Sequence, residues 1–121
     1  MKSKIAVGLF VYARPVHTAK ALEGLKNNGI SHLYVFSDAA KQGADANLVA
    51  AVRALIKSID WCAVHVIEQE INLGLDASIL FGIQYMFDRS DKIIVIENDC
   101  VPMPGFMHFF EYPSDEHMLR T

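Results

Sequence analysis

The stretch Ile93-Ile94-Val95-Ile96-Glu97-Asn98-Asp99 decides how this chain of 121 residues folds. Four β-branched residues in succession are typical of a strand that is covered on both faces, because no position is left for a solvent-facing side chain. Two carboxylates follow where this strand would reach the surface. The stretch therefore predicts a buried strand that delivers acidic side chains to one edge of a sheet.

Three earlier apolar runs have the same nearly continuous character, namely Ile5–Val11, Leu33–Phe36 and Ala63–Ile67. They too are expected to form strands covered on both faces. Between the runs, apolar residues recur at every third or fourth position, which is the period of a helix. The two clearest helical stripes consist of Leu48, Val49, Val52, Leu55, Ile56 and Ile59, and of Ile79, Ile83, Met86 and Phe87.

Prolines and aspartates indicate where the helices begin. Pro15 suits the first turn of a helix after the first strand, and Pro104 is expected to open a last helix. Asp45 and Asp76 precede or begin the two apolar stripes and are predicted to cap their helices.

The alternation of strands and helices predicts an α/β fold. Short links between them favour right-handed βαβ units, and hence a three-layer, Rossmann-like domain with a mainly parallel sheet of about four strands. We assign this domain to residues 1–110. The polar tail 111–121 is assigned no regular structure.

Composition excludes several classes of protein. Apolar residues make up 52% of the chain, which excludes a fully disordered protein. The net charge of −3 comes without a cluster of basic residues, so no nucleic-acid partner is expected. No apolar run reaches the roughly 18 to 20 residues of a transmembrane segment. Cys62 and Cys100 lack ligand-like spacing and are interpreted as free thiols of a cytoplasmic protein.

Ligands of open parallel sheets bind beyond the carboxyl ends of the strands, so the residues there are the candidates for function. Tyr12 and Arg14 follow the first strand, and the guanidinium of Arg14 suits a diphosphate beside a helix N-terminus. Asp38 follows the second strand and suits a ribose hydroxyl or a base N–H. Asn72 and Gly74 follow the third strand. For each position the alternative is an ordinary solvated charge, turn or helix cap.

The acidic exit of the fourth strand suits a divalent cation. Glu97 and Asp99 offer the hard oxygen ligands that Mg²⁺ and Mn²⁺ prefer, with substrate phosphates completing the coordination shell. The alternative is that these charges only cap a strand that has reached the surface. The five histidines show no metal-ligand spacing, and the chain contains no Gly-x-x-x-x-Gly-Lys or Gly-x-Gly-x-x-Gly motif.

Taken together, these motifs resemble GT-A glycosyltransferases over about residues 4 to 110. The motifs are Arg-Pro at 14–15, Asp38, Asn-Leu-Gly at 72–74, and Ile-Val-Ile-Glu-Asn-Asp-x-x-Pro-x-Pro-x-Phe at 94–106. The pattern is closest to bacterial sugar transferases of the family-two kind. It is also similar to the eukaryotic N-acetylglucosaminyltransferase I family, whose fourth strand ends Glu-Asp-Asp. Asn98 departs from that triplet and leaves one less charge for a cation.

The resemblance implies a nucleoside-diphosphate sugar, most simply a UDP-sugar, held through Mn²⁺ or Mg²⁺. It places Arg14 by the diphosphate, Asp38 on the base, and Glu97 and Asn98 near the ribose and sugar. Asp99 would ligate the metal together with Glu97. The implied nucleotide-sugar-binding residues are Tyr12, Arg14, Asp38, Asn72, Gly74, Glu97 and Asn98.

The chain is shorter than a complete GT-A domain, whose second half supplies the acceptor site and the general base of inverting enzymes. Transfer of a glycosyl group is therefore expected of the complete enzyme, and no catalytic residue is assigned. The alternative is a non-catalytic, truncated remnant that acts as a nucleotide-binding or interaction module. A truncated sheet would expose the edge of Ile93–Ile96, which predicts a homo-oligomer formed through that edge, or its coverage by the tail.

Overall fold

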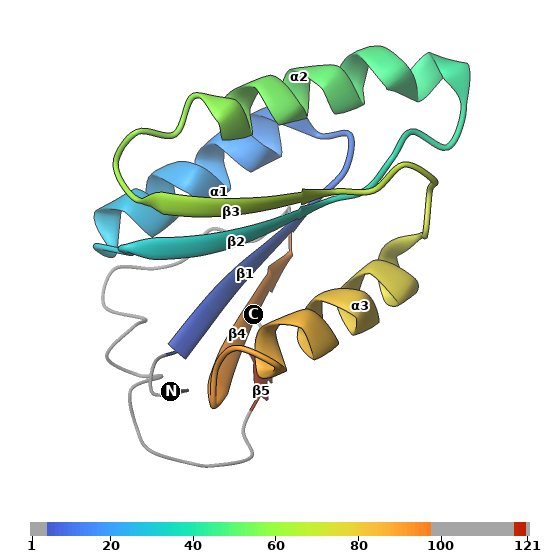
Figure 1. Ribbon diagram of the computed structural model, residues 1–121. Helices are drawn as coiled ribbons and strands as arrows, with labels where there is room; N and C mark the ends of the chain where they lie inside the picture. Colours follow the sequence, from blue (N-terminus) through green and yellow to red (C-terminus); the bar gives the residue numbers. More distant parts are fainter. Residues whose placement is uncertain (1–4, 98–117, 121) are drawn as a thin grey trace.

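The chain alternates strands and helices from Ile5 to Glu97, as expected of an α/β domain (Figure 1). The computed structural model describes residues 5–97 and 118–120. In order, its elements are β1 Ile5–Val11, α1 Pro15–Asn27, β2 His32–Ser37, the 3₁₀ helix η1 Gly43–Asp45, α2 Ala46–Lys57, β3 Ala63–Glu68, α3 Leu75–Phe87, β4 Lys92–Glu97 and β5 Met118–Arg120. The four predicted strands form within one or two residues of their expected bounds.

All strands of the sheet are parallel, and their order is β3-β2-β1-β4-β5. The chain moves outward from β1 to β3, crosses back over the sheet, and continues at β4 on the other side of β1. Leu9 of β1 is thus paired with Val35 on one side and with Ile96 on the other. The strand order reverses between β1 and β4, where open α/β sheets bind ligands.

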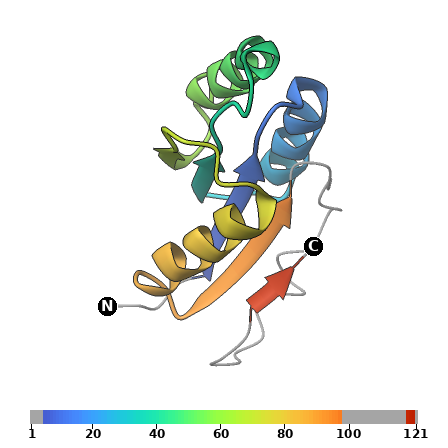
Figure 2. The same cartoon turned by 90° about the vertical axis from the view of Figure 1, so that its right-hand side faces the viewer.

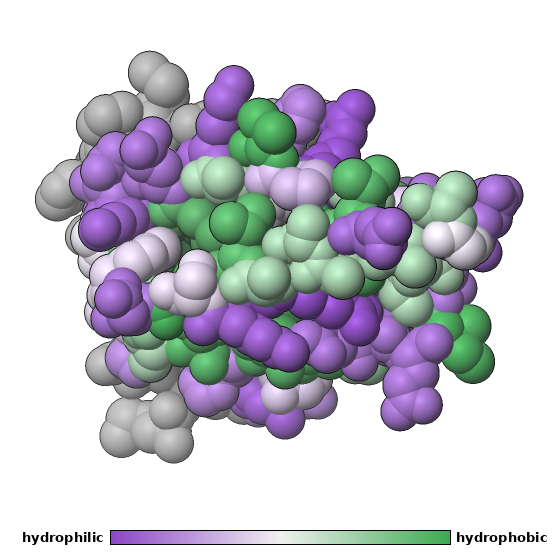
Figure 3. All heavy atoms as spheres, turned by 90° about the horizontal axis from the view of Figure 1, so that it is seen from above, coloured by the Kyte–Doolittle hydropathy of each residue, from purple (hydrophilic) through white to green (hydrophobic). Residues whose placement is uncertain are grey.

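Helices cover both faces of the sheet, which confirms the three-layer architecture (Figures 1 and 2). Helices α1 and α2 lie together on one face, and α3 lies on the other. Figure 3 looks down on the layer of α1 and α2, where a band of apolar and weakly apolar residues crosses the middle of the face and hydrophilic residues flank it. None of the helices in the described part of the chain is long and apolar enough to cross a membrane.

Alternate residues of β1 build two separate cores, because successive side chains of a strand point to opposite faces. Val7 and Leu9 pack with α1 and α2 in the larger core. Phe10 packs with α3 in the smaller one, where its ring stacks on Phe36 with centroids 4.8 Å apart. Gly82 of α3 allows this close approach, since a Cβ there would overlap the ring of Phe10.

Strand β3 departs from the prediction that every strand is covered on both faces. All six of its residues are exposed or half-buried, and Val66 is 40% exposed. β3 lies at one edge of the sheet, and its apolar composition reflects β propensity as much as burial. The expectation of two-sided burial was therefore wrong for Ala63–Ile67.

Residues Met118–Arg120 of the tail, to which no regular structure was assigned, form a strand. These residues form β5, which pairs with β4 through Ile93 and Met118, Ile94 and Leu119, and Val95 and Arg120. Coverage of the β4 edge by the tail was one of the two expected outcomes. The homo-oligomer stays a prediction, and the helix expected from Pro104 lies outside the described residues.

Neither aspartate predicted as a helix cap makes a capping hydrogen bond. Asp45 does precede α2, but its carboxylate is engaged by Tyr12 instead. Asp76 lies within the first turn of α3, and Gly74 occupies the cap position with φ 85°. A glycine serves there because this backbone conformation is strained for other residues.

Candidate functional site

A pocket of about 370 Å³ opens at the carboxyl ends of β1, β2 and β4. It lies at the reversal of strand order that the topology creates. Its walls come from the strand ends, the loops that follow them, and the first turn of α3. The lining residues are Phe10, Val11, Tyr12, Arg14, Phe36, Asp38, Lys41, Asn72, Gly74, Leu75, Ser78 and Glu97.

Tyr12 fixes the loop between β2 and α2 against the end of β1. Its hydroxyl donates a hydrogen bond of 2.7 Å to Asp45 and accepts one of 3.0 Å from the backbone N–H of Lys41. The pKa of the Tyr12 phenol is raised above 10.0, chiefly because the neutral form donates to Asp45 and also through burial. Lys41 is thereby held at the rim of the pocket.

Asp38 is buried at the end of β2, and its carboxylate accepts four hydrogen bonds. Oδ1 accepts from the backbone N–H groups of Ala39 and Leu73, each at 2.9 Å. Oδ2 accepts from the backbone N–H of Gly74 at 3.0 Å and from Nδ2 of Asn72 at 3.3 Å. Asn72 Nδ2 also donates to the carbonyl oxygen of Ala39 at 2.8 Å. The loop before α3 is therefore attached to the end of β2.

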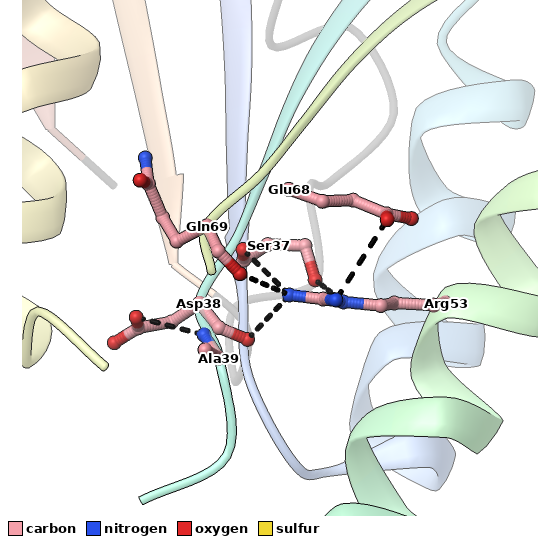
Figure 4. Close-up of polar contacts among 6 residues, drawn as sticks. All are labelled: Ser37, Asp38, Ala39, Arg53, Glu68 and Gln69. Carbon is pink, nitrogen blue, oxygen red and sulfur yellow. Dashed lines mark hydrogen bonds and ion pairs between the residues drawn. The ribbon is translucent and has the colours of Figure 1, made fainter. Parts of the chain in front are cut away.

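Arg53 of α2 joins the ends of β2 and β3 from the side opposite the carboxylate of Asp38 (Figure 4). Its Nε donates to the hydroxyl of Ser37 at 2.9 Å. Its Nη2 donates to the carbonyl oxygens of Ser37, Asp38 and Gln69 at 3.1 to 3.2 Å. Nη1 lies 3.7 Å from Oε1 of Glu68. Figure 4 shows the carboxylate of Asp38 pointing away from Arg53 while its carbonyl oxygen points toward it.

The pocket wall formed by α3 is apolar except for one hydroxyl. Ser78 is 7% exposed, and its Oγ is buried with no hydrogen-bond partner among the described residues. Phe10, Phe36 and Leu75 supply the apolar surface around it. The basic groups of the pocket are Arg14 and Lys41, both on exposed loop positions.

Comparison with known protein families, curated proteins and solved structures finds no match.

Six of the seven residues predicted to bind a nucleotide-sugar line this one pocket. They are Tyr12, Arg14, Asp38, Asn72, Gly74 and Glu97. They lie at or just beyond the ends of four strands, and the parallel sheet brings them to the same edge. The structure thus shows that they share a cavity, and their binding role stays a prediction. Asn98 and Asp99 lie outside the described residues.

Of the two predicted metal ligands, Glu97 and Asp99, only Glu97 lies among the described residues. Glu97, the half-buried last residue of β4, lines the pocket. Within residues 5–97 and 118–120, no group of three His, Cys, Asp or Glu side chains is arranged to hold a metal ion. Asp99 was the principal expected ligand, so the divalent cation stays a prediction.

Sequence reasoning missed Lys41, Ser78 and Arg53. Arg53 lies next to Val52 in the apolar stripe of α2, and a charge beside such a stripe is a weak signal of a buried role. Lys41 and Ser78 carry no signal that distinguishes them from solvated residues, because their place in the pocket follows from how the loop and α3 pack.

Proposed function

We propose that this chain is the nucleotide-sugar-binding half of a GT-A-type glycosyltransferase. Its pocket would bind a nucleoside-diphosphate sugar, most simply a UDP-sugar, together with Mn²⁺ or Mg²⁺. One observation supports this proposal above the others. Six residues selected from four separate stretches of sequence line a single pocket at the reversal of strand order.

The basic side of the pocket suits a diphosphate. Arg14 is the residue before α1, whose N-terminus carries partial positive charge. Lys41 contributes a second cation at the rim, where the hydrogen bond from its backbone to Tyr12 holds it. A planar guanidinium can donate two parallel hydrogen bonds to phosphate oxygens. Two cations and a helix N-terminus are therefore available to a ligand with two phosphates.

The acidic side suits a cation that is held mainly by the ligand. Mg²⁺ sites with phosphate ligands commonly use one or two carboxylates from the protein. Glu97 lines the pocket and would supply one such carboxylate. The oxygens of Asp38 already accept four hydrogen bonds and are poor candidates. When bound, the cation would neutralise negative charge that develops on the departing diphosphate.

Isothermal titration of the full chain with UDP, with and without Mn²⁺, tests the binding proposal. We expect Mn²⁺-dependent binding that Arg14→Ala weakens about tenfold or more, since a charge-assisted hydrogen bond contributes roughly 1.5 to 3 kcal/mol. Asp99→Ala and Glu97→Gln are expected to reduce the dependence on Mn²⁺. Arg89→Ala is the matched control, because Arg89 packs on Tyr85 at the far end of α3. No detectable heat at millimolar UDP would refute the proposal.

Binding and catalysis require separate tests. Turnover of a panel of nucleotide sugars, including slow hydrolysis, distinguishes a working transferase from a module that only binds the nucleotide. Binding without release of sugar from any donor would favour the non-catalytic alternative. Release that depends on Arg14 and Mn²⁺ would favour the enzyme.

A further inference from the structure

The side chain of Asp38 faces the loop before α3, and its hydrogen bonds account for its full capacity as an acceptor. A carboxylate offers about four lone pairs. Here two oxygens accept from three backbone N–H groups and one side-chain amide. A base or ribose could receive a hydrogen bond from Asp38 only by displacing one of these donors. Contact with the base, which the sequence suggested, would therefore disrupt the loop.

The backbone of Asp38 is fixed on both sides, which makes it a firm point of attachment. Its N–H donates to the carbonyl oxygen of Val11 at 3.1 Å, continuing the pairing of β1 and β2. Its own carbonyl oxygen accepts from Arg53 at 3.2 Å. The residue is 6% exposed. The side chain thus projects from a position that cannot shift without disturbing the sheet.

The other end of this connection is the pocket wall. Leu73 and Gly74 donate their backbone N–H groups to Asp38, and Gly74 is the cap of α3. Leu75 and Ser78, in the first turns of α3, line the pocket. A buried negative charge beside the N-terminus of α3 is also favoured by the helix dipole. The start of α3 therefore has its position set by Asp38.

We propose that Asp38 is a positioning residue that holds the Asn72–Gly74 loop and the first turn of α3 as a wall of the pocket, rather than a residue that reads the base. This inference rests on the proposed nucleotide site. It separates two roles that a carboxylate at this position can have. If Asp38 reads the base, its substitution changes the relative affinities for different nucleotides. If Asp38 positions the loop, its substitution weakens the binding of all nucleotides equally.

Titration of UDP, CDP and ADP in the presence of Mn²⁺ distinguishes these roles. Asp38→Asn keeps the shape of the side chain. It replaces one acceptor oxygen with an NH₂ group, which cannot accept hydrogen bonds from the N–H groups of the loop. We expect Kd to rise about tenfold for all three nucleotides, in line with one or two lost hydrogen bonds, with their ratios unchanged. Asp88→Asn, at the exposed end of α3, is the control and is expected to leave each Kd unchanged. Selective loss for one base alone would overturn the inference.

Hydrogen exchange of the wild-type chain provides a second test that needs neither a variant nor a ligand. The N–H groups of Leu73 and Gly74 are expected to be protected, and in Asp38→Asn to exchange about tenfold faster or more. Unprotected N–H groups in the wild type would overturn the positioning role. If no nucleotide binds the wild type, the proposed function fails, and the exchange rates still decide whether Asp38 holds the loop.

Discussion

The hydroxyl of Tyr12 donates a hydrogen bond of 2.7 Å to Asp45, which lies 33 residues further along the chain. This contact joins the end of β1 to the start of α2. The N–H of Lys41 donates to the same hydroxyl. The phenol oxygen of Tyr12 therefore fixes two points, Lys41 and Asp45, of the segment between β2 and α2. The loop forms one side of the pocket, and its shape depends on a contact with another strand.

Tyr12→Phe is expected to destabilise the protein by about 1 kcal/mol near neutral pH, the usual contribution of such hydrogen bonds. The pKa of Tyr12 is raised above 10.0 in the folded state, so folding favours the protonated phenol. This stabilisation is complete below about pH 10 and is lost as the pH rises through the folded pKa. The difference between wild type and variant should therefore shrink in alkali. Urea unfolding from pH 7 to 11 measures it, with Tyr34→Phe as the control, and a constant difference would argue against the Asp45 contact.

Arg53→Ala is expected to cost roughly 2 to 4 kcal/mol, because it leaves the carbonyl oxygens of Asp38 and Gln69 without the guanidinium donor. It also removes both hydrogen bonds to Ser37, whose carbonyl oxygen keeps the N–H of Gln69. Glu68→Gln should cost less than about 1 kcal/mol, since that pair is 3.7 Å apart and partly exposed. Lys57→Ala, one turn further along α2 and exposed, is the matched control. Chemical unfolding of the three variants tests the order. Equal losses for Arg53→Ala and Lys57→Ala would contradict it.

Gly82→Ala is expected to destabilise the protein, although alanine is the better helix former. The new Cβ would overlap the ring of Phe10, which is stacked on Phe36 and has little room to move. Overpacking costs about 1 to 3 kcal/mol, and helix propensity returns up to about 1 kcal/mol. Gly43→Ala meets no atom within 4 Å and is the control. A rise in thermal midpoint for Gly82→Ala would show that α3 packs less closely on β1.

Ser78→Ala is expected to stabilise the fold by about 0.5 to 1 kcal/mol. It removes a buried hydroxyl that has no partner among the described residues and places a better helix former in α3. Ser58→Ala provides the contrast, since that hydroxyl donates to the carbonyl oxygen of Leu55 at 2.7 Å. Thermal unfolding compares the two. A loss of stability for Ser78→Ala would reveal a partner for its hydroxyl.

Sequence patterns predicted the positions of the four main strands because each strand is a short, nearly continuous run of apolar residues. Each apolar run matches its strand to within one or two residues. Strand–helix alternation predicted parallel strands, and the order seen in the structure, with β1 between β2 and β4, fixes which strand ends meet. That is why six of the predicted residues line one pocket. The same reasoning misjudged β3, since a β-rich composition does not reveal whether a strand is central or at the edge.

The sequence by itself determined the strands, the helices and the chemical character of the strand ends, because these depend on neighbours a few positions away. Only the tertiary structure decided what each polar group binds. The carboxylate of Asp38 is directed at N–H groups more than 30 residues away, and Asp45 accepts from Tyr12 rather than capping its own helix. Such partners are selected by how loops and helices pack across the sheet, and a buried acceptor takes whichever donor that packing brings within reach.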